Sequence, residues 1–166
     1  MTRRIPLFGL MIAIATILFS VESLIPIPFP WFRIGLANII TLLVLKRWGF
    51  RYAIAVLILR ILIGSMLIGK LFQPAFFLSL TGGLASLVVM SLSIRLYPKY
   101  IGLIGVSVSG AVSHNLVQVV LTYIVYIRHR NIFSFIPFYI FAAIATGCII
   151  GLVVILTDQK LDTHQG

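Results

Sequence analysis

Long runs of hydrophobic residues alternate along this chain with short polar or proline-rich joints. Six runs stand out, over residues 5–25, 34–47, 52–68, 75–94, 101–127 and 134–157. A helix needs about 20 apolar residues to cross the hydrocarbon core of a bilayer. The short run 34–47 therefore predicts a tilted or partial helix, and the other runs predict full spans. The pattern indicates an all-α polytopic membrane protein, a six-transmembrane-helix bundle that forms one membrane domain over residues 1–166.

The composition agrees with this prediction and excludes several other classes of protein. Hydrophobic residues make up 61% of the 166 residues and charged residues only 10%, with a mean hydropathy of +1.16. A soluble domain is near half apolar and about a quarter charged. The chain has more apolar surface than a fold surrounded by water can bury. A soluble enzyme, an intrinsically disordered chain and a secreted disulfide scaffold are therefore excluded.

Basic residues are distributed unequally between the two sides of the predicted bundle. Eight fall on one side of an alternating six-span path: Arg3, Arg4, Lys46, Arg47, Arg51, Arg95, Lys99 and Lys160. Four fall on the other side: Arg33, Lys70, Arg128 and Arg130. Because Lys and Arg concentrate in cytoplasmic loops, this asymmetry predicts a multi-pass protein of a bacterial-type plasma membrane with both termini in the cytoplasm. The loops 26–33, 69–74 and 128–133 are then expected to face outward.

The same basic residues account for a net charge of +10, from 13 Lys and Arg against 3 Asp and Glu. A surface that binds nucleic acid needs a basic cluster that can follow a phosphate backbone. No such cluster stands clear of the apolar runs in this sequence. The excess of positive charge is therefore typical of loops beside anionic lipid headgroups, and nucleic acid is not expected as a partner.

Polar residues within the apolar runs are the candidates for a functional site, because burying a polar group in hydrocarbon is costly. There are six of them: Glu22, Asn38, Arg60, His114, Asn115 and Gln118. Glu22 is the only acid in a run and Arg60 is the only base deep within one. A direct ion pair or a shared polar cavity would relieve the cost of burying both charges.

All six residues are expected in the outer half of the membrane or near its midplane, where they could line one outward-opening ligand-binding cavity. His114 and Gln118 are four residues apart and Asn115 and Gln118 are three apart, so their side chains lie on nearly one helix face. Hydrogen bonding between packed helices is the alternative role for Asn, Gln and His. For Glu22 with Arg60 the alternative is a purely structural pair. Both alternatives stay open at this point.

A second pattern is formed by small residues on the first helix. Gly9 and Ala13 lie four residues apart. Small residues at this spacing allow another helix to approach closely, because little side chain separates the two backbones. That helix could belong to this chain or to a partner protein.

Residues that could form a catalytic or metal centre are scattered. The acids are few and far apart: Glu22, Asp158 and Asp162. Such a set does not build the acid cluster that holds magnesium on a diphosphate. The histidines fall in a span, an outer loop and a cytoplasmic tail: His114, His129 and His164. No phosphate-binding GxxxxGK[ST] loop is present. We therefore expect no enzyme activity, no catalytic residue, no metal and no cofactor.

Several motifs together resemble a known family. They are Glu22-Ser23-Leu24-Ile25-Pro26, Arg33-Ile34-Gly35-Leu36-Ala37-Asn38, Leu59-Arg60 with Gly64, Thr81-Gly82-Gly83, and Gly110-Ala111-Val112-Ser113-His114-Asn115-Leu116-Val117-Gln118. In this order they resemble the Gx transporter family, often labelled heptaprenyl diphosphate synthase component I. That family is similar to the substrate-binding (S) subunits, also called S components, of energy-coupling factor (ECF) transporters. The resemblance covers nearly the whole chain.

The resemblance implies a six-helix S subunit that binds a vitamin or another micronutrient near the outer face. Such subunits associate with a membrane coupling subunit and two cytoplasmic ATPase subunits. Small residues on the first helix of the family contact the coupling subunit, which implies that role for Gly9 and Ala13. Alanines are usual at these positions, so Gly9 departs from the pattern.

Three functions are compatible with these observations. The first is a binding and uptake subunit whose energy comes from partner ATPases. The second is a non-catalytic membrane accessory subunit of polyprenyl diphosphate or quinone biosynthesis, which would bind a prenyl chain between helices. The third is a subunit of a membrane electron-transfer complex, but the lone Cys148 cannot hold an iron–sulfur cluster. The missing acid cluster also argues against the synthase label.

Overall fold

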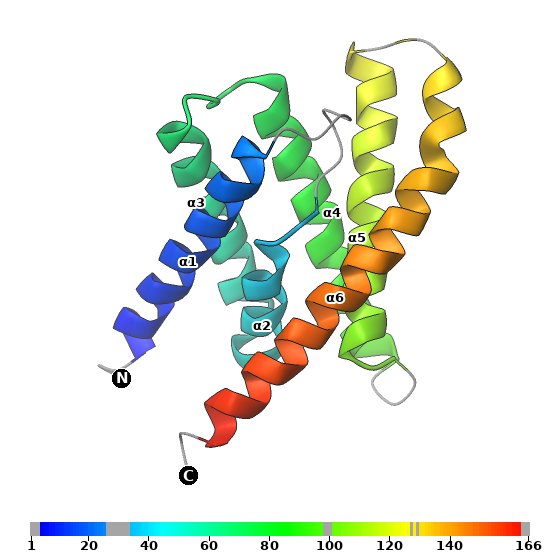
Figure 1. Ribbon diagram of the computed structural model, residues 1–166. Coiled ribbons are helices and arrows are strands. Elements are labelled where there is room, and N and C mark those ends of the chain that lie inside the picture. The colour runs from blue at the N-terminus through cyan, green and yellow to red at the C-terminus, as the bar shows by residue number, and fades with distance from the viewer. Residues whose placement is uncertain (1–3, 26–33, 98–100, 127, 129, 164–166) are drawn as a thin grey trace.

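The computed structural model of the protein describes residues 4–25, 34–97, 101–126, 128 and 130–163. No strand is found in this part of the chain. It contains six α-helices: α1 Arg4–Leu24, α2 Asn38–Trp48, α3 Phe50–Leu67, α4 Pro74–Leu96, α5 Leu103–Leu121 and α6 Ile136–Thr163. Between α5 and α6 lie the π-helix η1 Thr122–Tyr126 and the 3-10 helix η2 Arg130–Phe135. Successive helices run in opposite directions along the bundle (Figure 1). The predicted all-α, six-helix bundle is confirmed.

Five helical segments are long and apolar enough to cross a membrane: Pro6–Leu24, Phe50–Leu67, Pro74–Leu96, Leu103–Tyr126 and Asn131–Thr163. Large aliphatic side chains such as Ile17, Leu67 and Ile149 are more than half exposed on these helices. A surface of this kind is stable in contact with lipid and unstable in water. The protein is therefore a multi-pass membrane protein.

The second helix, α2, is the partial one that the short run 34–47 predicts. It has 11 residues, which corresponds to a length of about 16 Å, roughly half of the hydrocarbon core. Residues 34–37 precede it without joining the helix, and Gly35 adopts φ +84°. Figure 1 shows α2 confined to one half of the bundle.

The first residue of α1 and the last residue of α6 lie at the same end of the bundle, which we call the terminal end (Figure 1). We call the opposite end, where α1, α3 and α5 finish, the distal end. α2 occupies the terminal half and is buried up to Leu45 except for Ile39, which is partly buried; Leu42, Leu43 and Val44 are each at most 2% exposed. Residues 34–37 precede the helix on its distal side.

Glycines allow α5 and α6 to pack closely together. A Cβ atom on Gly147 would lie 2.7 Å from the Cα of Val108, and one on Gly151 would lie 2.7 Å from the Cα of Ile104. The two glycines are four residues apart, so they face the same side of α6 and admit the backbone of α5. This seam supports α5, the helix that carries three of the predicted site residues.

Candidate ligand-binding site

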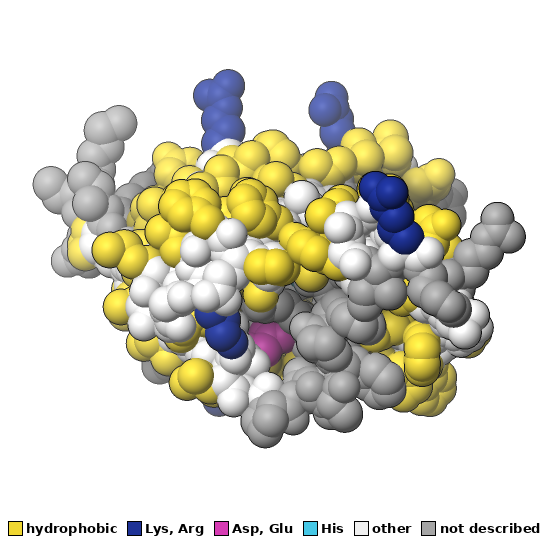
Figure 2. Space-filling model, turned by 90° about the horizontal axis from the view of Figure 1, so that it is seen from above, with side chains coloured by type: hydrophobic (Ala, Val, Ile, Leu, Met, Phe, Trp, Pro, Cys, Tyr) yellow, Lys and Arg dark blue, Asp and Glu magenta, His cyan; other side chains and the backbone are white. Residues whose placement is uncertain are grey.

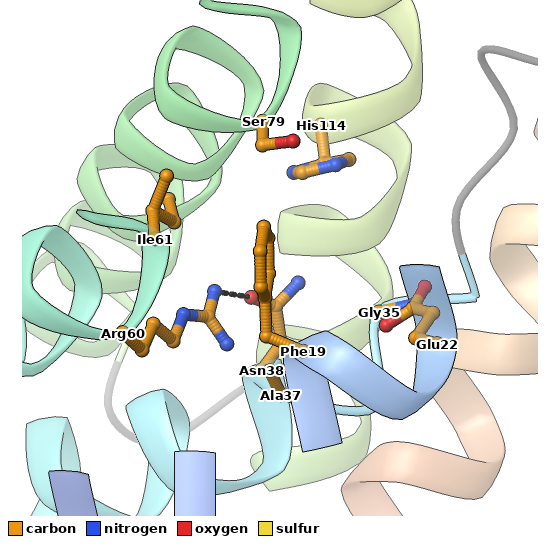
Figure 3. A pocket seen from close by; sticks show the side chains of 9 residues that line it. All are labelled: Phe19, Glu22, Gly35, Ala37, Asn38, Arg60, Ile61, Ser79 and His114. Atoms are coloured by element: carbon orange, nitrogen blue, oxygen red, sulfur yellow. Dashed lines mark hydrogen bonds between the residues drawn. The ribbon is translucent and has the colours of Figure 1, made fainter. Parts of the chain in front are cut away.

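A pocket lies where the N-terminus of α2 stops short of the distal end. It is lined by residues of the helices α1 to α5 and of the segment just before α2: Phe19, Glu22, Gly35, Ala37, Asn38, Arg60, Ile61, Ser79 and His114 (Figure 3). The cavity volume open to water is about 20 Å³, which is room for about one water molecule. The pocket therefore has little free volume in this conformation.

Four of the six predicted site residues meet in this pocket. Glu22 comes from α1, Asn38 from α2, Arg60 from α3 and His114 from α5. Each is at most 7% exposed. Four polar side chains from four helices thus share one small buried space, although the longest separation between them is 92 positions along the chain.

Arg60 is held in the pocket by a hydrogen bond to α2. Its Nη2 atom donates to Oδ1 of Asn38 at 2.7 Å. Asn38 is the first residue of α2, so this bond connects the middle of α3 to the N-terminal end of the half-length helix. A hydrogen bond to a charged group is stronger than one between neutral groups. This bond fixes the direction of the guanidinium group. Arg60 as a whole is only 3% exposed.

Glu22 binds backbone rather than Arg60. Its Oε1 accepts from the N–H of Gly35 at 2.6 Å and its Oε2 accepts from the N–H of Leu36 at 3.0 Å. The direct ion pair between Glu22 and Arg60 is not formed, and the shared cavity is the arrangement found. In Figure 3, Asn38 and Phe19 lie between the two charged groups. Backbone N–H groups that precede a helix carry partial positive charge, so this carboxylate is well placed to stabilise the start of α2.

Asn115 and Gln118 do not line the pocket, although they are only 4% and 1% exposed. Gln118 is turned toward α4, where its Nε2 donates to the carbonyl oxygen of Leu78 at 3.3 Å. Gly82 of α4 permits this approach, since a Cβ there would lie 3.1 Å from both Gln118 and His114. The expectation that all six residues line one cavity is corrected for these two, because the contact with α4 holds Gln118 beside the pocket.

Other residues of the pocket were not predicted from the sequence. Phe19 and Ile61 form apolar walls and Ser79 adds a hydroxyl that donates to the carbonyl of Ala75 at 2.5 Å. Phe19 can lie against α3 only because residue 64 is glycine, since a Cβ there would lie 2.4 Å from its ring. An apolar residue in an apolar run carries no sequence signal for such a role, whereas Gly64 stood in the motif with Arg60.

The distal face of the molecule shows where the pocket approaches the surface. An acidic side chain is visible within a hollow of this face, and basic side chains stand nearby and toward the rim (Figure 2). Lys70, in the connection between α3 and α4, donates from Nζ to the carbonyl oxygen of Ser23 at 3.3 Å. Ser23 follows Glu22 directly, so this contact fixes the end of α1 next to the pocket.

Gly9 and Ala13 are exposed on α1. A Cβ atom on Gly9 would meet no other atom within 4 Å. Gly147 and Gly151, in contrast, face the backbone of α5. Internal packing within the described residues therefore does not explain the small side chain at position 9.

Comparison with known proteins identifies the family. The sequence model of the family described as heptaprenyl diphosphate synthase component I matches residues 11–156. The chain belongs to this family. The family indicated by the motifs in the sequence is thus confirmed. No curated protein and no solved structure matches the chain.

The acids of this component I family member lie in two separate places. Glu22 is in the pocket, whereas Asp158 and Asp162 are near the end of α6. Asp158 accepts hydrogen bonds from Nζ of Lys46 and from Nε of Arg47, and Arg47 also reaches Asp162 at 2.6 Å. No group of three or more metal-binding side chains forms within the described ranges. These ion pairs connect the C-terminal end of α2 to α6 at the terminal end.

Proposed function

We propose that this protein is the substrate-binding membrane subunit of an energy-coupling factor type importer, and that it captures a vitamin or another small micronutrient from outside the cell. One observation carries the proposal. Four buried polar side chains from four helices surround a single pocket at the free end of a half-length helix. Intramembrane ionisable residues that face a shared cavity are typical of substrate sites in membrane proteins.

The pocket combines the elements of a selective small-molecule site. Ligand sites have mostly apolar walls with a few placed polar groups. Here Phe19 and Ile61 supply the walls and Arg60 supplies a charged donor, while Asn38 and His114 supply further hydrogen-bonding atoms. Arg60 would pair with an anionic or carbonyl-bearing group of the ligand. Because the cavity holds about one water molecule, binding must be accompanied by widening.

The proposed ligand site also includes Asn115 and Gln118. Both are buried on α5 within one turn of His114. A widened pocket would extend along this helix, because residues four apart lie above one another on the same face. Their role differs from that of the four lining residues, since they would meet the ligand only after the pocket opens.

The basic residues support a bacterial-type plasma membrane location with both termini in the cytoplasm, which turns the pocket outward. Labelling of a cysteine introduced at Lys70 from outside the cell tests this orientation.

Two cytoplasmic ATPase subunits would supply energy, and a membrane coupling subunit would contact the exposed α1 face at Gly9 and Ala13. The protein itself would have no catalytic activity.

The test is to identify the small molecules that the purified protein retains. We expect mass spectrometry to find one compound enriched with the wild-type protein and depleted with a folded Arg60→Ala variant. Arg95→Ala is the matched control, because Arg95 is exposed at the last turn of α4. The ATPase subunits should co-purify with the wild type. A protein that retains no compound and binds no ATPase subunit would contradict the proposal.

The family description supports a second candidate function, a non-catalytic membrane accessory subunit of polyprenyl diphosphate or quinone biosynthesis. The description names the family as one component of a synthase, which supports action together with another protein. The two functions differ in that partner. Co-purification of a prenyl synthase, with a prenyl compound retained in place of a micronutrient, would favour this second function.

A further inference from the structure

Three buried polar side chains follow one another along a single face of the α5 segment. His114, Gln118 and Thr122 are spaced four residues apart and are 6%, 1% and 1% exposed. This spacing places the three side chains in a row along the helix. His114 lines the pocket and faces it together with Ser79 of α4 (Figure 3). The row therefore begins at the pocket and continues toward the distal end.

Thr122 differs from every other threonine that the structure describes. The other six each donate from Oγ1 to the carbonyl four residues earlier: Thr16, Thr41, Thr81, Thr146, Thr157 and Thr163. This bond is the usual way for a threonine in a helix to satisfy its hydroxyl. Thr122 Oγ1 is buried and has no hydrogen-bond partner in the described part of the chain. Its hydroxyl is thus available to another molecule.

Gln118 shows the same feature one turn closer to the pocket. Its Nε2 donates a hydrogen bond to the carbonyl oxygen of Leu78. Its Oε1 is buried and has no hydrogen-bond partner among the described residues. Buried polar atoms without a partner are rare in native proteins, and those that persist call for a functional explanation. Two of them, one turn apart and in line with the pocket, indicate a common role.

The backbone changes at this same point. Thr122 is the first residue of η1, where α5 continues as a π-helix. A π-helical turn is rare in proteins, and here it forms the last described turn of the α5 segment. Next to Gln118, α4 has a glycine at position 82, where a Cβ would lie 3.1 Å from both Gln118 and His114, so no α4 side chain stands between these two residues and the α4 backbone at this point.

We infer that Gln118 and Thr122 line the polar access route between the pocket and the distal surface, along the seam of α4 and α5. This inference rests on the proposed function, because it deepens the description of the same site. The route is closed in this structure and opens when a ligand or water enters it. Gln118 Oε1 can only accept hydrogen bonds. The route therefore suits ligands that carry hydroxyl or N–H donors on the end that passes it.

The test is the reactivity of introduced cysteines toward water-soluble thiol reagents in open membrane fragments. The native Cys148 is first replaced by serine, and Thr122→Cys and Gln118→Cys are then compared with Val119→Cys. Val119 is as deeply buried, at 1% exposed, but apolar. Only an ionised thiol in contact with water reacts, so we expect aminoethyl methanethiosulfonate to modify positions 122 and 118 at least about tenfold faster than position 119. Equal, slow reaction at all three positions would overturn the inference.

The preference for donors is tested with the Thr122→Cys protein, in which Gln118 is retained. After correction for their rates with a free thiol, the ammonium-bearing reagent should react faster than sulfonatoethyl methanethiosulfonate, which has no donor. The additional substitution Gln118→Leu should remove this preference. A preference for the sulfonate would overturn the assigned ligand class. Because these measurements need neither the ATPases nor a retained compound, unreactive cysteines in a protein that still retains one would refute the route and leave the proposed function intact.

Discussion

Arg60 Nη2 donates to Asn38 Oδ1 at 2.7 Å, and this hydrogen bond holds the N-terminal end of α2 against the middle of α3. The two residues are 22 positions apart and at most 7% exposed. Because α2 has only 11 residues, its N-terminus lies inside the bundle and not at a membrane surface. The bond therefore stabilises a buried helix end and orients a buried cation at the same time.

The first prediction concerns this bond. Asn38→Leu removes the acceptor while keeping a side chain of similar size, and it leaves Arg60 with one fewer partner. We expect the free energy of unfolding to fall by about 1–3 kcal/mol, the typical cost of leaving a buried polar group unsatisfied. Asn38→Asp keeps an acceptor opposite Arg60 and should be less destabilising. Thermal unfolding of both variants in detergent measures this, and a Leu variant as stable as wild type would contradict the assigned role.

The second prediction concerns the wall of the pocket. In Gly64→Ala the new Cβ would lie 2.4 Å from Cδ1 of Phe19, so the ring must move, and it lines the pocket. We expect a loss of stability of about 1–3 kcal/mol and a reduced amount of the compound that the purified protein retains. Gly102→Ala is the control, because a Cβ at Gly102 meets nothing within 4 Å. Equal retention by the two variants would show that Phe19 does not shape the site.

The third prediction concerns the ion pairs at the terminal end. Asp158→Asn removes the charge that Lys46 and Arg47 share. The Asp158 side chain is 9% exposed whereas that of Lys46 is 42% exposed. We therefore expect a loss of about 1–3 kcal/mol, below the 3–5 kcal/mol typical of a fully buried pair. Asp162→Asn, at a side chain 69% exposed, should cost less than about 1 kcal/mol. Thermal unfolding should rank the two variants in this order.

The fourth prediction concerns the exposed small residues of α1. Gly9→Leu and Ala13→Leu should weaken assembly with a membrane coupling subunit, because a bulky side chain separates the two helix backbones. Retention of the bound compound should stay unchanged, since both positions are exposed and away from the pocket. Ala145→Leu, on an exposed position of α6, is the control and should assemble normally. Normal assembly and uptake with all three variants would remove the partner role of this surface.

Much of the fold could be predicted from the sequence because the bilayer imposes simple rules on it. Long apolar runs must become helices, since no water is available to satisfy an open backbone. The runs therefore predicted the all-α bundle, and the shortness of run 34–47 predicted that the second helix is partial. Polar residues are rare in such runs, and four of the six that the sequence singles out, Glu22, Asn38, Arg60 and His114, line one pocket.

Only the tertiary structure decided how these residues are used. Glu22 and Arg60 carry opposite charges, but Glu22 binds the backbone of Gly35 and Leu36 instead. Every residue except proline has a backbone N–H, so no sequence pattern can identify such a partner. The direction of Gln118 depends likewise on the approach of α4 at Gly82. Hydropathy along the chain determines which segments enter the membrane, whereas the contacts between helices determine which buried polar groups face the pocket.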